Sequence, residues 1–198
     1  MIMTQPLPFP TLWCHEPVVR RLWYGERALW CEHLLRLDPQ ARRDRFAGLV
    51  SDAFIRSYCD EDAPFSQELF GAFVDGELRA VGEFALISGD WPRSAELAFS
   101  VEQPWQGQGL GSTLFRRLMV HARNLSVRRV FIISEPHNAR MHHIARKHGM
   151  ALTRDDHEIA GRMELVGPSY FSVMEEVVGE GVAFWRQTPD LQTITRGR

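Results

Sequence analysis

The chain has 198 residues, 44% of them apolar, and a formal net charge of -2, which fits a folded domain and argues against a dominant, non-specific nucleic-acid-binding protein. No window is long and apolar enough to cross a bilayer, and the first ten residues lack the charged start and continuous apolar core of a signal peptide. The three cysteines have no C-x-x-C spacing and fit a reduced compartment, so we expect a cytoplasmic protein without nucleic-acid or membrane partners.

The N-terminal half is expected to contain an arm, three helices and a β-hairpin. Residues 1–24 begin with a proline-rich run and are assigned to the arm. Asp38 before Pro39 has the pattern of an N-cap followed by a first-turn proline, so it separates two helices. Asp75-Gly76 between two apolar runs predicts a hairpin turn. The predicted elements are helices over 26–37, 39–46 and after Ser51, and strands over 69–74 and 77–88.

The C-terminal half alternates strands and helices. A strand over 95–101 precedes a helix over 110–124 whose apolar residues lie on one face. The remaining predictions are a strand over 129–134, a helix over 138–148 that Gly149 ends, a strand pair over 151–154 and 162–166, and a helix over 171–186 within a C-terminal extension, 170–198. This order predicts one mixed α/β domain, 1–198, built around a single sheet.

A glycine-rich turn lies between the predicted strand 95–101 and the helix that follows it. Its small residues leave backbone N–H groups uncovered at the positive end of a helix dipole, which predicts a pyrophosphate site. A dinucleotide-binding G-x-G-x-x-G turn fits less well, because its last glycine is replaced and the turn follows an antiparallel meander. A helix that merely begins at a flexible turn is the other alternative. The sequence of the turn is Gln106-Gly107-Gln108-Gly109-Leu110-Gly111-Ser112.

The same turn has the spacing Q-x-x-G-x-G, in which Gln106, Gly109 and Gly111 are the defining residues. Val101–Trp105 before the turn, and Asn138, Met141 and Lys147–Met150 after it, extend the match. In this ordered set, residues 95–166 resemble the GNAT superfamily of acyl-CoA-dependent N-acetyltransferases. The motifs are most similar to those of the bacterial protein-lysine acetyltransferase branch.

The resemblance implies a mostly antiparallel central sheet flanked by helices, with splayed fourth and fifth strands. It implies acetyl-CoA as co-substrate, bound by the core 95–166. The pyrophosphate would lie on Gln106 through Ser112, and the pantetheine arm along the strand edge at Phe99, Ser100 and Val101. Asn138 would contact the pantetheine; an N-cap of the following helix is an equally good assignment from sequence.

Glu96 is the candidate general base. Acetyl transfer requires a neutral amine, and an amine is mostly protonated at pH 7. Glu96 stands between Ala95 and Leu97 in an apolar run, where partial desolvation would raise its basicity. The protein-lysine acetyltransferase branch has a catalytic Glu at this place. The alternative is an outward-facing Glu in an alternating strand, with Glu83 on the neighbouring strand as the reserve base.

One family feature is absent. Many GNAT proteins carry a Tyr in the later helix that protonates the leaving thiolate, and counting from Asn138 places Ala145 there. A non-catalytic acyl-CoA-binding regulatory module is therefore the alternative to an enzyme. The acceptor is expected to be a small-molecule amine or a protein lysine, and the oligomeric state stays open, with a homodimer as one option.

Four histidines lie close together in the sequence. Their spacing within the predicted helix 138–148 is not the i, i+4 spacing of paired helical metal ligands. We therefore expect no metal site among them. The four residues are His137, His142, His143 and His148.

Overall fold

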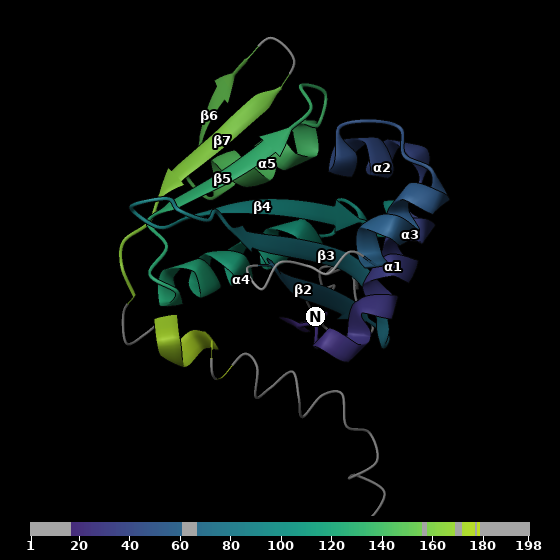
Figure 1. Cartoon of the computed structure of the whole chain (residues 1–198), viewed down its shortest axis with the longest axis horizontal. Helices are drawn as coiled ribbons and strands as arrows, with labels where there is room; N and C mark the ends of the chain where they lie inside the picture. The colour runs from purple at the N-terminus through teal and green to yellow at the C-terminus, as the bar shows by residue number, and fades with distance from the viewer. Residues whose placement is uncertain (1–16, 61–66, 156–157, 169–171, 177, 179–198) are drawn as a thin grey trace, which may run out of the picture.

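A single seven-stranded sheet organises the computed structural model, which describes residues 17–60, 67–155, 158–168, 172–176 and 178. Within these residues the strand order is β1-β2-β3-β4-β5-β7-β6, and all neighbours are antiparallel except the parallel pair β4–β5 (Figure 1). The mixed, mostly antiparallel α/β class is confirmed. The strands are β1 (Val18–Arg21), β2 (Gln67–Val74), β3 (Glu77–Leu86), β4 (Ser94–Val101), β5 (Arg129–Ser134), β6 (Ala151–Arg154) and β7 (Ile159–Glu164).

Helices cover both faces of this sheet. The N-terminal helices pack on one face of β2–β4, and the long helix after the glycine turn packs on the other (Figure 1). Within the described ranges, no helix combines the length and the hydropathy needed to cross a membrane. The helices are α1 (Arg27–Arg36), α2 (Pro39–Phe46), α3 (Asp52–Asp60), α4 (Leu110–Asn124) and α5 (Ala139–Lys147), with short 3-10 turns η1 (Tyr24–Glu26) and η2 (Gln103–Trp105).

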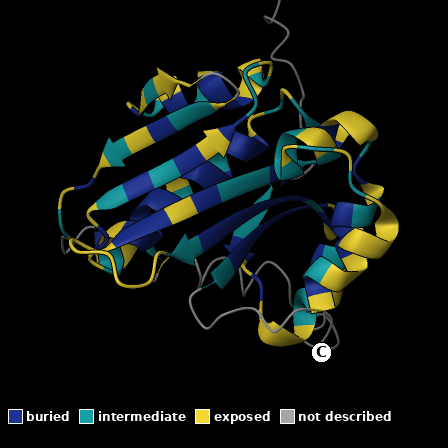
Figure 2. Ribbon diagram, turned by 45° about the horizontal axis from the view of Figure 1, so that its top comes forward, coloured by how far each residue is buried: buried dark blue, intermediate teal, exposed yellow. Residues whose placement is uncertain are grey.

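Two apolar cores lie on the two faces of the sheet. Alternation along β2 sends Leu69 and Phe73 toward α1 and α3, and Phe70 and Ala72 toward α4. The central strands are therefore buried on both sides, while the outer surfaces of the helices are exposed (Figure 2). This burial fixes β4, which carries the predicted site, between two packed layers.

Local signals in the sequence predicted several boundaries correctly. Asp75 and Gly76 both have positive φ angles, 51° and 81°, as a two-residue hairpin turn requires. Asp38 caps α2 by accepting from the N–H groups of Gln40 and Ala41, at 2.9 and 3.1 Å. Gly149, with a φ of 81°, follows the end of α5.

Three elements differ from the expectation. β1 lies inside the segment assigned to an N-terminal arm. Its four residues pair with β2, from Val18 opposite Phe73 to Arg21 opposite Phe70. The sequence analysis missed it because a short edge strand has too little sequence pattern to be recognised. β7 begins at Ile159, three residues before the predicted start, because it pairs along the whole of β5. Of the C-terminal helix, 172–176 and 178 are helical, and its other residues lie outside the described ones.

Candidate functional site

The glycine turn leads into a helix whose first turn has no side-chain cap. Gly107 and Gly109 have φ angles of 74° and 92°, in the left-handed region that favours glycine. A Cβ added to either would meet no atom within 4 Å, so open space borders this backbone. Gly109 is the N-cap of α4 and makes no side-chain cap. The uncapped N–H groups and the helix dipole together form an anion-binding arrangement.

The turn is held in place by its neighbours. The Gln106 side chain donates from Nε2 to the carbonyl of Val101 at 3.0 Å, which ties the turn to the end of β4. A Cβ on Gly111 would lie 2.9 Å from Cδ1 of Ile144. Gly111 therefore serves a second purpose, because it allows α4 and α5 to pack closely beside the turn.

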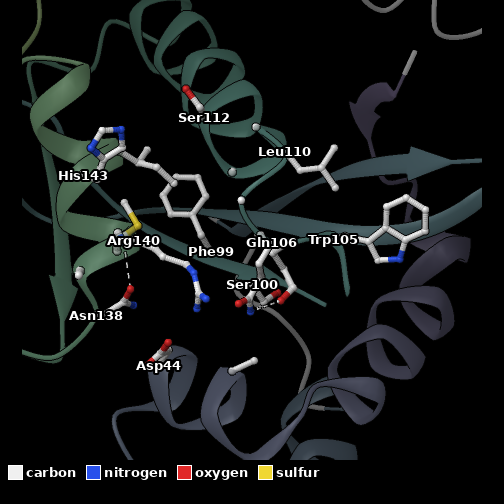
Figure 3. Close-up of a pocket in the computed structure, with 18 of the residues that line it drawn as sticks. Asp44, Phe99, Ser100, Trp105, Gln106, Leu110, Ser112, Asn138, Arg140 and His143 are labelled. Carbon is white, nitrogen blue, oxygen red and sulfur yellow. Dashed lines mark hydrogen bonds between the residues drawn. The ribbon is translucent and has the colours of Figure 1, made fainter. Parts of the chain in front are cut away.

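A cavity of about 480 Å³ opens beside this turn (Figure 3). All the residues predicted to bind the cofactor line it except Gln108, whose side chain donates to the carbonyl of Pro104 at 2.8 Å. The cavity runs from the start of α4 along the edge of β4. Residues that the sequence analysis did not assign to it also line it: Ala41 and Asp44 from α2, Trp105, and Ala139, Arg140, Met141, His143, Ile144 and Lys147 from α5.

The edge of β4 is open because β4 and β5 separate. The two strands pair at only three positions, and the last is Glu96 opposite Phe131. From Leu97 to Val101, β4 continues without β5 beside it, so its backbone groups on that edge are unpaired by the sheet. A smaller cavity of about 30 Å³ lies in this gap and shares Asp44, Phe99, Asn138 and Met141 with the larger one. The splay expected from the family resemblance is present.

Glu96 lies at the point where the strands separate. It is exposed, and it makes no hydrogen bond or ion pair with any residue that the structure describes. Alternation places it on the face of Ala98 and Ser100, which is the face covered by α1 and α2. It does not line either cavity. The expected partial desolvation of Glu96 is therefore not observed, because its side chain is exposed.

Glu83, the reserve base, has opposite surroundings. It is 4% exposed and lies across from Ala98 of β4. Arg45 of α2 binds both of its carboxylate oxygens, at 2.8 and 2.5 Å, and the hydroxyl of Tyr58 donates to it at 3.0 Å. Burial, and then the Glu83 carboxylate, raise the pKa of Tyr58. Glu83 is thus held in a buried ion pair with Arg45 of α2.

Sequence reasoning missed a chain of hydrogen bonds that links α1 to the end of β4. His33 of α1 is fully buried; its Nε2 lies 2.9 Å from Oγ of Ser100 and its Nδ1 lies 3.2 Å from Glu102. Burial lowers the pKa of His33 and outweighs the neighbouring Glu102 carboxylate. A carboxylate only accepts, so the neutral imidazole donates from Nδ1 and accepts from Ser100 at Nε2. This chain holds Ser100, which lines the cavity.

Two residues of the later helix also have defined places. Asn138 accepts from the N–H of Met141 at 3.0 Å, so it is the N-cap of α5, and it lines the cavity as well. Ala145 is fully buried and does not line the cavity. The position expected to hold a Tyr acid therefore carries no hydroxyl.

The histidines of this region each contact a different group. His148 packs on Phe115 and lies 2.8 Å from Oγ of Ser112, while His142 lies 3.1 Å from Oγ of Ser134. His137 reaches across to α2, where its Nε2 lies 2.9 Å from Asp44. In the described part of the chain, no group of three or more His, Cys, Asp or Glu side chains is arranged to hold a metal ion.

Comparisons with known proteins agree with this geometry. The model of the acetyltransferase (GNAT) family matches residues 20–150. The chain is 29% identical over 143 residues to acetyltransferase PA5475 of Pseudomonas aeruginosa, covering 70% of this chain and 76% of that protein.

Solved structures show the same fold. The GNAT domain of S. lividans PAT has a TM-score of 0.63 and 21% identity, covering 74% of this chain and 89% of that one. The PaiA N-acetyltransferase from Thermoplasma acidophilum, in complex with coenzyme A, has a TM-score of 0.58 and 16% identity. The match covers 76% of this chain and 100% of that one. With two thirds of the chain matched by one family model and its fold shared with solved members, this protein belongs to the acetyltransferase (GNAT) family and is an acyltransferase enzyme.

Proposed function

We propose that this protein transfers the acetyl group of acetyl-CoA to a primary amine. The observation that carries the proposal is the continuous cavity that joins the uncapped start of α4 to the open edge of β4. One end suits a pyrophosphate, and the edge suits an extended arm of amides. The resemblance to a PaiA N-acetyltransferase in complex with coenzyme A supports this donor.

The residues present fit coenzyme A at both ends of the cavity. The N–H groups at Leu110, Gly111 and Ser112 would bind the pyrophosphate. The edge of Phe99 to Val101 would pair with the pantetheine amides, and Ser100 is already oriented by His33. When bound, the acetyl thioester supplies an electrophilic carbonyl, and a backbone N–H of β4 beyond the last β5 pair would stabilise the oxyanion.

Glu96 is the proposed general base. It stands two residues from Ala98 on the same face of β4, a distance of about 7 Å along a strand. Because it is exposed and lies outside the cavities, it would take the amine proton through a water molecule. The neutral nitrogen then attacks the carbonyl, a C–N bond forms, and the C–S bond breaks as the thiolate leaves with its electron pair. The nitrogen loses its second proton to water as the amide forms, and water protonates the thiolate, since Ala145 offers no acid.

Mass spectrometry with isotopically labelled acetyl-CoA tests this function. The protein is incubated with lysine peptides, spermidine and amino acids, and transfer is expected as a labelled acetyl group on an amine nitrogen. A matched reaction without protein controls for spontaneous acetylation. Binding of coenzyme A without transfer to any amine would favour the non-catalytic regulatory module instead.

A further inference from the structure

Asp44 of α2 reaches into the cavity from the side opposite the start of α4 (Figure 3). It lines the large cavity and also the small cavity in the gap between β4 and β5, so it lies where the two meet. We propose that Asp44 binds the acceptor as an ammonium ion and thereby selects amines that are positively charged at neutral pH. This inference rests on the proposed function and adds the charge class of its acceptor.

The Asp44 carboxylate is fixed in position but retains an oxygen for a ligand. Its Oδ1 lies 2.8 Å from Nε2 of Gln40 and 2.9 Å from Nε2 of His137. Both contacts fall on Oδ1, and the described residues provide no bond to Oδ2. The side chain is 20% exposed, so part of its hydration is lost. An ammonium group, with its three donors and opposite charge, would satisfy such a carboxylate better than a neutral hydroxyl.

The charges around Asp44 also favour a cation. The guanidinium of Arg45 forms an ion pair with Glu83, so it does not neutralise Asp44. On the far side of His137, Glu135 lies 3.9 Å from Nδ1 of the imidazole and adds negative charge. Arg140 also reaches into the cavity from α5, with its guanidinium directed toward the α2 side (Figure 3), but it forms no ion pair with Asp44.

The kinetic consequence follows from which form of the acceptor Asp44 binds. A carboxylate stabilises an ammonium ion relative to the neutral amine. Asp44 therefore promotes binding of the acceptor but does not help the nitrogen to lose its proton, which is the task proposed for Glu96. Loss of the Asp44 carboxylate should therefore raise the KM of the acceptor, whereas loss of the base should lower kcat.

Steady-state kinetics of Asp44→Asn test the assignment. The acceptors are Nα-acetyl-lysine methylamide, which represents a protein lysine, and spermidine, which represents a free polyamine. We expect the variant to raise the KM of each accepted amine at least tenfold and to leave the KM of acetyl-CoA within about twofold of wild type, because one charge-assisted hydrogen bond is lost. If the wild-type protein acetylates only one of the two amines, the result shows whether the acceptor is a protein lysine or a free polyamine. The KM of that amine in the variant then tests Asp44.

Two control variants separate binding from tethering. If Asp44 acted only by tethering α2 to His137, His137→Ala would raise the acceptor KM as much as Asp44→Asn. The proposal instead expects His137→Ala to keep an acceptor KM well below that of Asp44→Asn, and Asp90→Asn, far from the cavity, to match wild type. Equal effects of the Asp44 and His137 variants, or an unchanged KM in Asp44→Asn, would overturn the assignment. No transfer to any amine by the wild-type protein would contradict the proposed function, and the assignment with it.

Discussion

At the scale of single residues, the two candidate bases share a face of the sheet but differ in their surroundings. Glu96 is exposed and has no partner among the described residues, whereas Glu83 is buried and bound by Arg45, Tyr58 and Gln67. A base must exchange a proton with substrate or water, which Glu96 can do. Glu83 has no such access, because its side chain is buried and Arg45 binds both of its carboxylate oxygens.

Glu96→Gln is expected to lower kcat by about 10²–10⁴-fold, because it removes the proposed proton acceptor while keeping the shape of the side chain. The KM of acetyl-CoA is expected to stay close to that of wild type, since Glu96 does not line the cavity. Steady-state kinetics with a saturating amine measure both constants, and the exposed Glu77→Gln on β3 is the matched control. Wild-type turnover in Glu96→Gln would exclude this residue as the base.

Glu83→Gln is expected to lower the free energy of unfolding by about 3–5 kcal/mol, because it leaves the buried guanidinium of Arg45 without its counter-charge. Urea denaturation measures the change. The double variant Glu83→Gln with Arg45→Met should recover part of the loss, since no buried charge then remains unpaired. An unchanged denaturation midpoint combined with a large fall in kcat would instead make Glu83 the base.

At the scale of elements, the start of α4 and the end of β4 form one unit. Gln106 ties the turn to Val101, and Gly111 lets α5 approach α4. The glycines of the turn thus have separate tasks. Gly107 and Gly109 adopt left-handed backbone beside open space, while Gly111 is a packing contact between two helices. Substitutions within this turn should therefore differ in their effects.

Gly107→Asn is expected to weaken coenzyme A binding with little loss of stability. Asn tolerates left-handed backbone better than most residues, and its side chain would occupy the open space beside the turn. Calorimetric titration measures the affinity, and thermal unfolding measures the stability. Gly111→Val is the contrasting variant, because its side chain would collide with Ile144 and lower the melting temperature. Wild-type affinity in a folded Gly107→Asn protein would argue against a cofactor site at this turn.

At the scale of the whole molecule, the C-terminal helical residues 172–176 lie beside α4 (Figure 1), and a charged cluster joins them to α4 and β2. His121 of α4 lies 2.7 Å from Glu176 and 3.2 Å from Glu68 of β2. Arg117 lies 3.4 Å from Glu176, and Asn124 also donates to it. Burial would lower the pKa of His121, but the two carboxylates outweigh it and raise that pKa. The hydrogen bond from His121 lowers the pKa of Glu176 to about 2.

These shifts predict a pH window for the attachment of residues 172–176. The stability that protonated His121 gives to this attachment is present below its ordinary pKa of 6.5 and is lost as pH rises through its raised pKa. The contribution of Glu176 is present above its ordinary 4.5 and is lost as pH falls toward about 2. Hydrogen exchange, corrected for intrinsic rates, should therefore show the strongest protection of 172–176 between these two ordinary values. His121→Gln should flatten the profile, and protection that keeps rising above pH 8 would contradict the prediction.

The sequence by itself determined the order of the elements from α1 to β7, the hairpin, the helix caps and the glycine turn. These features depend on residues close together in the chain, because a cap, a two-residue turn and an apolar periodicity are local properties. The family resemblance then placed Phe99 to Val101 and Asn138 near the same cofactor, and the structure brings them to one cavity.

Only the tertiary structure decided the electrostatics of the site. The contact between Asp44 and His137 joins residues 93 positions apart, and the ion pair of Arg45 with Glu83 joins residues 38 apart. No local pattern encodes such pairs, so the burial of Glu83 and the place of Asp44 in the cavity were beyond sequence reasoning, and the structure decided between the desolvated and the outward-facing alternatives for Glu96. Whether a carboxylate serves as base, ion-pair partner or ligand depends on which distant elements pack over it, because packing sets both its hydration and its neighbouring charges.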